Sequence, residues 1–303
     1  MSDQRIRPDN LDLAALFLRV GLGLVFVIGG ISKLSQLLDP ARETAIVNSY
    51  WGTSGYVNQF FIDFMFGPGG LSPWWFLTTL SFFEAISGIL LLAGLFVRPL
   101  SLIYGFLLWS FVIALPVVTT PTVDVSVKTY MAPAILVQIR DIGLSGLMFA
   151  LFNLGSGLYS LDARLLRKPT IESHANWDNL GLLVRLSLAL PLLVAGVFNG
   201  MPNIPTFASS ALILIPLAIL VVGGNGLRYV GVLVAGVMIW YMLQKLNMDK
   251  SLIANLNGFK REFAFLAGGL VLAIFSGGRL YTFTQGLNYI KSGSSGQPNM
   301  QAR

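Results

Sequence analysis

Long apolar stretches separated by short polar segments dominate the pattern along the chain. A helix needs about 20 apolar residues to cross the hydrocarbon core of a bilayer, and each of these stretches approaches that length. We expect spans near residues 12–32, 76–97, 100–118, 132–158 (or 140–158), 180–199, 207–224, 227–244 and 263–281. The pattern therefore predicts an all-α integral membrane protein with about eight transmembrane helices.

The connection between the first two spans is the longest and has a pattern of its own. Within residues 39–75, the stretch 41–50 is compatible with a short helix, and YVNQFFIDFMF at 56–66 is aromatic and amphipathic. Both are too short to span, and Trp74-Trp75 follow, a residue type typical of the headgroup level. We expect this connection to lie at the membrane interface.

The two halves of the chain resemble each other in their apolar stretches. Arg19 and Arg185 occupy matching positions in the first and fifth spans. LLLAGLFVRPLS at 90–101 is similar to ILVVGGNGLRYVG at 219–231, and LSGLMFALFNLGSGLYS at 144–160 aligns without gaps on LAGGLVLAIFSGGRLYT at 266–282. Such self-similarity predicts an internal repeat.

The repeat predicts a division into two pseudo-repeated four-helix bundles. The first unit is expected at residues 1–162, a polar linker at 163–179, the second unit at 180–285 and a flexible tail at 286–303. The second copy is degenerate, because Leu214 stands where the first copy has Glu84, and YSLD becomes YTFT. A polar site in the first unit is thus expected to be absent from the second.

Composition supports the membrane assignment and excludes several functions. The chain is 54% hydrophobic and 11% charged, whereas soluble domains are about one-quarter charged. Its net charge of +6 is scattered over helix ends and loops, so we expect no nucleic-acid partner. With no cysteine and with His174 alone in the linker, neither a thiol-based metal site nor a bis-histidine haem can be built by this chain, and we expect no metal site.

The distribution of lysine and arginine predicts the orientation. Eight spans place both termini on one side, and the short turns and the linker on that side are rich in arginine. By the positive-inside rule both termini are expected in the cytoplasm, in a bacterial or archaeal cell (inner) membrane. The opposite side collects Lys33, Arg140, Lys245 and Lys260, among others.

Glu84 is the clearest candidate for chemistry, because it is the acidic residue well inside a predicted span. One hypothesis makes it a proton acceptor beside a quinone or another lipid-soluble ligand. The other makes it half of a structural ion pair. Arg19 would approach it from the opposite face, since the two lie about 12 Å and 10 Å inside a core of about 30 Å, and Arg140 is a second possible partner.

The remaining candidates are charged residues near helix ends. Arg19 and Arg185 are candidate ligands for an anion or a headgroup, or they snorkel or hydrogen-bond a neighbouring helix end. Arg140 and Asp141 are candidate ligand- or quinone-binding residues, with an interface anchor and a helix cap as the alternative.

The first half resembles the DoxX family, including the DoxD-type subunit of thiosulfate:quinone oxidoreductase. The resemblance rests on Arg19, Gly29-Gly30 and Lys33-Leu34 in the first span, on Glu84 followed by GILLLAGLFVRP, and on GSGLYSLD after the fourth span. It covers about residues 12–166 and, more faintly, 180–285. It implies a four-helix membrane bundle in a membrane redox system.

Three functions remain open at this stage. The first is a non-catalytic integral subunit of a respiratory, photosynthetic or sulfur-oxidising complex, which packs against partner helices and lines a quinone path. The second is the quinone-reactive membrane subunit of a thiosulfate:quinone oxidoreductase, and the third is a small-solute or lipid transporter. We expect no intrinsic cofactor, a quinone as the candidate ligand, bound lipids, and other membrane subunits as partners.

Overall fold

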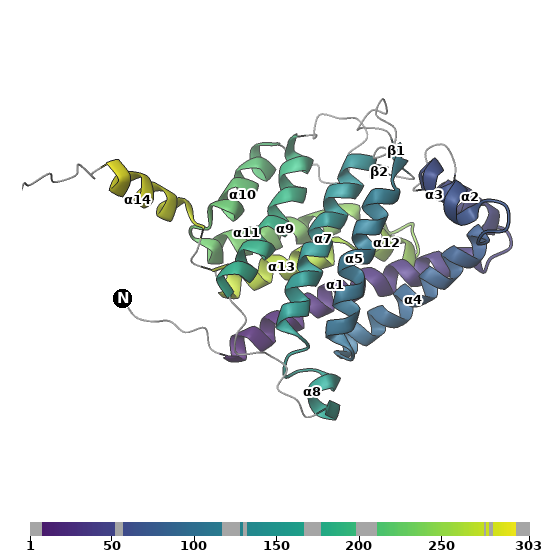
Figure 1. Cartoon of the computed structure of the whole chain (residues 1–303), viewed down its shortest axis with the longest axis horizontal. Coiled ribbons are helices and arrows are strands. Elements are labelled where there is room, and N and C mark those ends of the chain that lie inside the picture. Colours follow the sequence, from purple (N-terminus) through teal and green to yellow (C-terminus); the bar gives the residue numbers. More distant parts are fainter. Residues whose placement is uncertain are drawn as a thin grey trace, which may run out of the picture.

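The computed structural model describes residues 8–51, 57–116, 128–129, 132–166, 177–197, 211–275, 277–278 and 281–294, and these are almost entirely helical (Figure 1). Part of the predicted polar linker, with His174, and the last nine residues of the predicted tail lie outside this range. So do the first four residues of the predicted sixth span.

Among the described residues, six helices are long and apolar enough to cross a membrane: α1 (Pro8–Leu37), α4 (Pro73–Ala93), α5 (Val97–Ala114), α7 (Ala134–Leu154), α9 (Trp177–Val197) and α11 (Leu227–Lys245). The prediction of an all-α, multi-pass membrane protein is confirmed. The count of eight is not. The helices α10 (Ala211–Gly223) and α13 (Glu262–Phe275) have 13 and 14 residues, or about 20 Å, less than the roughly 30 Å of a bilayer core.

Short elements connect these helices. They are α2 (Glu43–Trp51), α3 (Gln59–Phe66), the antiparallel pair β1 (Lys128–Thr129) and β2 (Ala132–Pro133), α8 (Leu161–Leu166), α12 (Leu252–Phe259) and α14 (Phe283–Ser294). The short helices α2 and α3 agree with the pattern of residues 39–75. Residues 286–294 of the expected tail belong to α14, an amphipathic helix that projects from the bundle (Figure 1).

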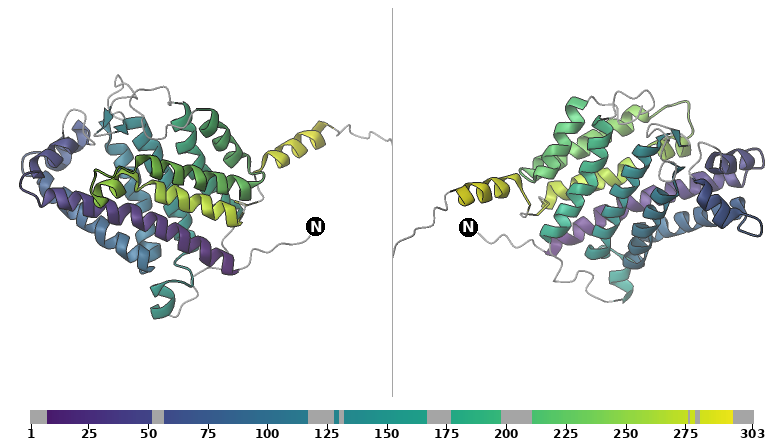
Figure 2. Two further views of the ribbon diagram at one scale, coloured as in Figure 1. Left: turned by 180° about the vertical axis from the view of Figure 1, so that it is seen from behind. Right: turned by 45° about the horizontal axis from the view of Figure 1, so that its top comes forward.

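The long helices pack as a central group with two flanking pairs. In the centre, α1 packs against α13 and α7 packs against α9. On one side α4 packs on α1 and α5 on α7, and on the other α10 packs on α9 and α11 on α13 (Figures 1 and 2). The flanking helices carry many of the exposed large apolar side chains, such as Phe106 on α5 and Leu233 on α11. An apolar outer surface is what lipid contact requires.

Small residues set the register between α1 and α4. A Cβ on Gly30 would stand 2.5 Å from the backbone nitrogen of Ala85 and 2.6 Å from the carbonyl oxygen of Ser81. A Cβ on Gly88 would stand 2.6 Å from the backbone nitrogen of Val27. The two backbones therefore approach too closely for any side chain at either glycine, and this close contact decides which residues of the two helices lie at the same height.

Candidate functional site

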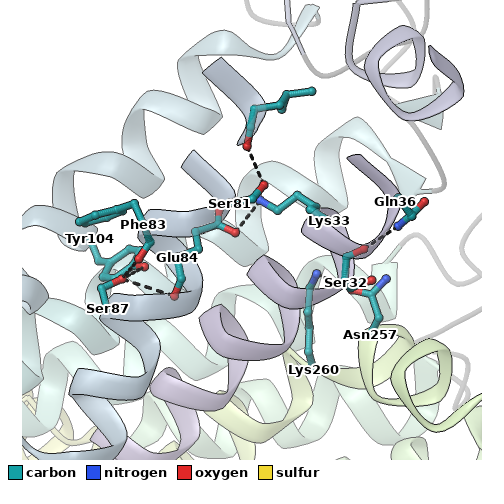
Figure 3. A network of polar contacts seen from close by, with 11 residues as sticks. Ser32, Lys33, Gln36, Ser81, Phe83, Glu84, Ser87, Tyr104, Asn257 and Lys260 are labelled. Carbon is teal, nitrogen blue, oxygen red and sulfur yellow. Dashed lines mark hydrogen bonds and ion pairs between the residues drawn. The ribbon is translucent and has the colours of Figure 1, made fainter. Parts of the chain in front are cut away.

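Glu84 of α4 forms a buried ion pair with Lys33 of α1 (Figure 3). The carboxylate oxygen Oε2 lies 2.5 Å from Lys33 Nζ, and the two side chains are 6% and 15% exposed. Such a pair is held firmly, because removal of either partner leaves an uncompensated charge away from water. Glu84 is thus paired with an amine that the sequence places at the end of the first span.

The proposed pairing of Glu84 with Arg19 is wrong, and the helix register explains why. The missing Cβ of Gly29 would lie 3.7 Å from Glu84 Oε2, so Glu84 is level with Gly29. Arg19 is ten residues earlier, about 15 Å down the helix axis. Helical side chains lean toward the helix N-terminus, so Lys33, one turn beyond Gly29, reaches back to the carboxylate.

A second lysine approaches the same point from the other half of the chain. Lys260, between α12 and α13, has its Nζ 3.1 Å from the position of a Cβ on Gly29, and it donates a hydrogen bond of 2.7 Å to Asn257 Oδ1. Burial of its ammonium group lowers the pKa of Lys260 well below its ordinary value, and the nearby charges of Arg261 and Lys33 act in the same direction. The charge of Glu84 raises the pKa of Lys260 and so partly opposes this shift.

Hydroxyl groups extend the polar region along α4 and α5. Ser87 Oγ lies 2.6 Å from the hydroxyl of Tyr104 and 3.4 Å from the carbonyl oxygen of Glu84, and it also donates to the carbonyl oxygen of Phe83 (Figure 3). Both Ser87 and Tyr104 are buried. A carboxylate, two amines and a phenol near one another are groups that can hold and transfer protons.

Arg140 and Asp141 are also buried, and their suggested role as an interface anchor and cap is wrong. They lie in the second turn of α7, not at its first residue, and Arg140 Nε is 3.6 Å from Asp141 Oδ1. Arg140 is thus paired with its neighbour Asp141, whereas Glu84 is paired with Lys33. The charge of Arg140 also acts on Lys245 and Lys260.

A third buried ion pair joins Lys245 of α11 to Glu262 of α13. Together with the pairs Glu84–Lys33 and Arg140–Asp141 and with Lys260, it forms a charged network that links both halves of the protein. Sequence reasoning missed Lys245, Lys260 and Glu262 as members of a site. The available signal was that Lys33, Arg140, Lys245 and Lys260 are all expected at the same side, but the pattern does not reveal that they point inward.

Arg19 binds the end of a neighbouring helix. Its Nη1 donates to the carbonyl oxygens of Leu91 and Leu92, at 3.3 Å and 2.5 Å, and its Nη2 donates to that of Tyr159. These carbonyls belong to the last turn of α4 and to the segment after α7, where intrahelical donors are missing. Gly94 ends α4 with φ +72°, and a Cβ there would lie 2.8 Å from Arg19 Nη1.

Arg185 makes the corresponding contacts in the second half. Its Nε donates to the carbonyl oxygen of Val221 at 3.1 Å, and its Nη2 donates to those of Val222 and Tyr281, the latter at 2.8 Å. Gly224 has φ +77°, and a Cβ there would lie 2.8 Å from Arg185 Nη2. Of the alternatives considered for these two arginines, the described contacts fit the last, because each side chain hydrogen-bonds the end of a neighbouring helix.

The residues that carry the DoxX resemblance meet in this arrangement. Gly30 allows α1 and α4 to touch, Lys33 pairs with Glu84, and Arg19 joins α4 to the segment after α7. Comparison with family models matches the DoxX model at residues 14–119, which extends from α1 to the residues after α5. No curated protein and no solved structure matches the chain. Residues 14–119 are therefore similar to the DoxX family, and the chain is a helical, multi-pass membrane protein.

Proposed function

We propose that this protein is a non-catalytic integral subunit of a larger membrane redox complex, which it holds together through helix–helix contacts and in which it lines a quinone path. The observation that carries the proposal is that buried acidic residues are paired with basic residues. Glu84, Asp141 and Glu262 each have a basic partner inside the helix bundle. Their arrangement is that of groups that fix helices, and the redox assignment rests on the DoxX resemblance.

The outer surface supplies the contacts that a subunit needs. On α5, the exposed apolar side chains recur at helical spacing and form one stripe: Leu102, Ile103, Phe106, Trp109 and Ile113. Aromatic anchors of this kind are enriched where proteins contact one another. The opposite face of α5 is buried against α7. We assign the α5 stripe to a partner helix.

Purification from the native membrane tests this proposal. The chain, extracted in a mild detergent, is expected to migrate with at least one further membrane polypeptide that carries a redox cofactor. A photoreactive residue at Phe106 should crosslink to that polypeptide, and one at Leu233 on α11 is the matched lipid-facing control. A chain that migrates alone and crosslinks only to lipid from both positions would contradict the proposal.

A second candidate is the quinone-reactive membrane subunit of a thiosulfate:quinone oxidoreductase. It is favoured by the grouping of Glu84 with two amines and with the hydroxyls of Ser87 and Tyr104, since reduction of a quinone consumes protons. Glu84→Gln is expected to abolish thiosulfate-dependent quinone reduction by the assembled complex. Unchanged turnover in a complex that still assembles would rule out this candidate.

The internal repeat is part of the proposal. We propose that the chain consists of two tandem four-helix units, in which α1, α4, α5 and α7 correspond to α9, α10, α11 and α13. The equivalent contacts of Arg19 and Arg185 support it, because each arginine joins the end of the second helix to the segment after the fourth. The packing of the helix pairs supports it as well.

The proposed location is a bacterial or archaeal cell membrane with both termini in the cytoplasm. The chain has no cysteine, so a single introduced thiol reports the side on which it lies. Met248→Cys and Tyr229→Cys are suitable, because these side chains are 89% and 80% exposed. An impermeant maleimide should label Met248→Cys in intact cells and Tyr229→Cys only after permeabilisation. The reverse pattern would contradict this orientation.

A further inference from the structure

The C-terminal helix α14 carries an apolar stripe that is largely exposed. Phe283 and Leu287 lie one helical turn apart, and their side chains are 52% and 58% exposed. Ile290 is the next apolar residue at this spacing in the sequence. Gln285 and Asn288, which are also exposed, lie on other sides of the helix. A short helix with one apolar and one polar side is stable only where something apolar covers its stripe.

The apolar surface of α10 leads directly to this stripe. Ile219, Leu220 and Val222 are exposed on α10, as expected of side chains that contact lipid. At the end of that helix the ring of Phe283 lies against Gly223, where a Cβ would stand 2.7 Å from two of the ring carbons. The exposed apolar surface is therefore continuous from α10 to the first turn of α14.

Two neighbouring contacts fix how α14 is rotated about its axis. Phe283 contacts Gly223, the last residue of α10, whereas the hydroxyl of Thr284 donates to Asn225 Oδ1 at 2.9 Å. Asn225 is exposed in the polar turn that follows α10. Successive residues of a helix point about 100° apart, so one side of α14 faces the apolar end of α10 and another faces this turn. Leu287 lies on the same side as Phe283.

The chain changes direction before α14. Gly278 and Tyr281 have φ of +83° and +59°. Thr282 then caps the new helix, since its Oγ1 accepts a hydrogen bond of 3.3 Å from the backbone nitrogen of Gln285. As a result α14 does not continue α13, and it projects from the end of the bundle at which α1 begins (Figures 1 and 2).

That end of the bundle is where the apolar helices reach the headgroups. Tyr229, near the start of α11, and Tyr281, directly before α14, are exposed there, and tyrosine is enriched at the headgroup level. An amphipathic helix at this level buries its apolar side at the boundary between headgroups and acyl chains. A bilayer thus supplies the apolar cover that the stripe of α14 needs.

We propose that α14 binds the surface of the bilayer that the bundle spans. In this placement Phe283 and Leu287 lie among the first acyl carbons, next to the lipid-facing side of α10, and Gln285 and Asn288 lie toward water. The placement is independent of the role of the chain in a redox complex, because it depends on the contacts of α10 and α14 alone.

Nitroxide labels on single cysteines test this placement in the full chain, reconstituted in lipid nanodiscs. The chain has no cysteine of its own, so Leu287→Cys gives one labelled position on the stripe and Gln285→Cys gives a matched one off it. Both side chains are exposed in the protein, so a helix surrounded by water would leave both labels open to a water-soluble nickel chelate. On a bilayer, the label of Leu287→Cys should collide with the chelate roughly tenfold less often than that of Gln285→Cys, because a polar chelate is excluded from acyl chains. Its collisions with oxygen, which dissolves in the acyl region, should be more frequent.

The collision rates separate the possible surroundings of the stripe. Equal rates with the chelate at the two positions would place α14 in water and overturn the proposal. Low rates with both the chelate and oxygen at Leu287→Cys would overturn it as well, because protein rather than lipid would then cover the stripe.

A change in the stripe gives an independent result. With the label on Gln285→Cys, Leu287→Asp places a charge among the acyl chains, while Leu287→Met keeps the stripe apolar. Leu287→Asp is expected to increase the mobility of the label, and Leu287→Met should leave the spectrum unchanged. Because α14 lies outside the bundle, both variants should elute from a sizing column as the wild type does. An unchanged spectrum in Leu287→Asp would show that the bilayer does not hold the helix, contrary to the proposal.

Discussion

The pairing of Glu84 leads to a prediction about stability that differs for its two partners. Glu84→Gln removes the carboxylate and leaves Lys33 and Lys260 as neighbouring buried amines without it. Lys33→Met removes one amine, but the Nζ of Lys260 lies on the same side of Gly29 and can take over the carboxylate. We therefore expect Glu84→Gln to cost more than Lys33→Met.

The magnitudes follow from the burial of the pair. Loss of one partner of a buried ion pair costs about 3–5 kcal/mol, and the 6% and 15% exposure of the two side chains places this pair in that class. We expect this full cost for Glu84→Gln. In Lys33→Met, Lys260 can pair with the carboxylate in place of Lys33, and this reduces the cost to roughly 1–3 kcal/mol. The double variant should be less costly than Glu84→Gln by roughly 1–3 kcal/mol, because Lys33 is then neutral and Lys260 alone of these two amines is left without the carboxylate.

Reversible unfolding of the four proteins in mixed micelles, with the detergent ratio as denaturant, measures these differences. The double-mutant cycle isolates the coupling between the two side chains. Lys33→Met/Lys260→Met is the further control, and it should be as unstable as Glu84→Gln, because the carboxylate then has neither amine. Equal and small costs for both single variants, with no coupling, would refute the buried ion pair and the role of Lys260.

Three further predictions concern packing, helix ends and pH. Gly30→Leu should destabilise the protein by at least about 3 kcal/mol, since its side chain would meet the backbone of α4, while Gly236→Ala, with nothing within 4 Å, should be neutral or stabilising by roughly 0.5–1 kcal/mol, both measured by unfolding in micelles. Arg185→Lys should cost roughly 3 kcal/mol, because a single nitrogen cannot replace the two guanidinium nitrogens that reach carbonyls on two segments. A midpoint like that of the wild type would contradict this. The pKa of Lys260 is lower in the folded protein than its ordinary value near 10.5, so the unfolded chain binds the extra proton and stability should rise as pH increases from the depressed pKa toward that value. Unfolding midpoints across this range should rise less in Lys260→Met, and identical slopes would exclude the effect.

The sequence determined that this protein lies in a bilayer and that it is helical. Apolar stretches of span length with few charges can be satisfied in a bilayer only as helices, because the backbone must bond within each segment. The positions of most long helices therefore followed from hydropathy alone. The helices α10 and α13 are shorter than the predicted spans, because an apolar stretch does not determine where its helix begins or ends.

The sequence also indicated the candidate residues, but not their partners. Glu84 was identified because a carboxylate inside an apolar span is unusual. Its partner depended on the height of α4 relative to α1, which is set by the close contact at Gly30 and Gly88. A shift by a few residues would have placed another residue beside the carboxylate, and no periodicity along one helix contains that information.

The charged network and the contacts at the helix ends were decided by the tertiary structure. Lys260 and Glu84 are 176 positions apart in the sequence and meet beside Gly29 only because α13 packs on α1. The change from Asp162 to Thr284 is visible in the sequence as YSLD against YTFT. Its consequence is not, because the contacts of Asp162 with two backbone amides, and of Thr284 with Asn225, are properties of the folded turns. The sequence by itself determined where the chain resides and which residues are unusual there, and the packing of helices decided what each of those residues touches.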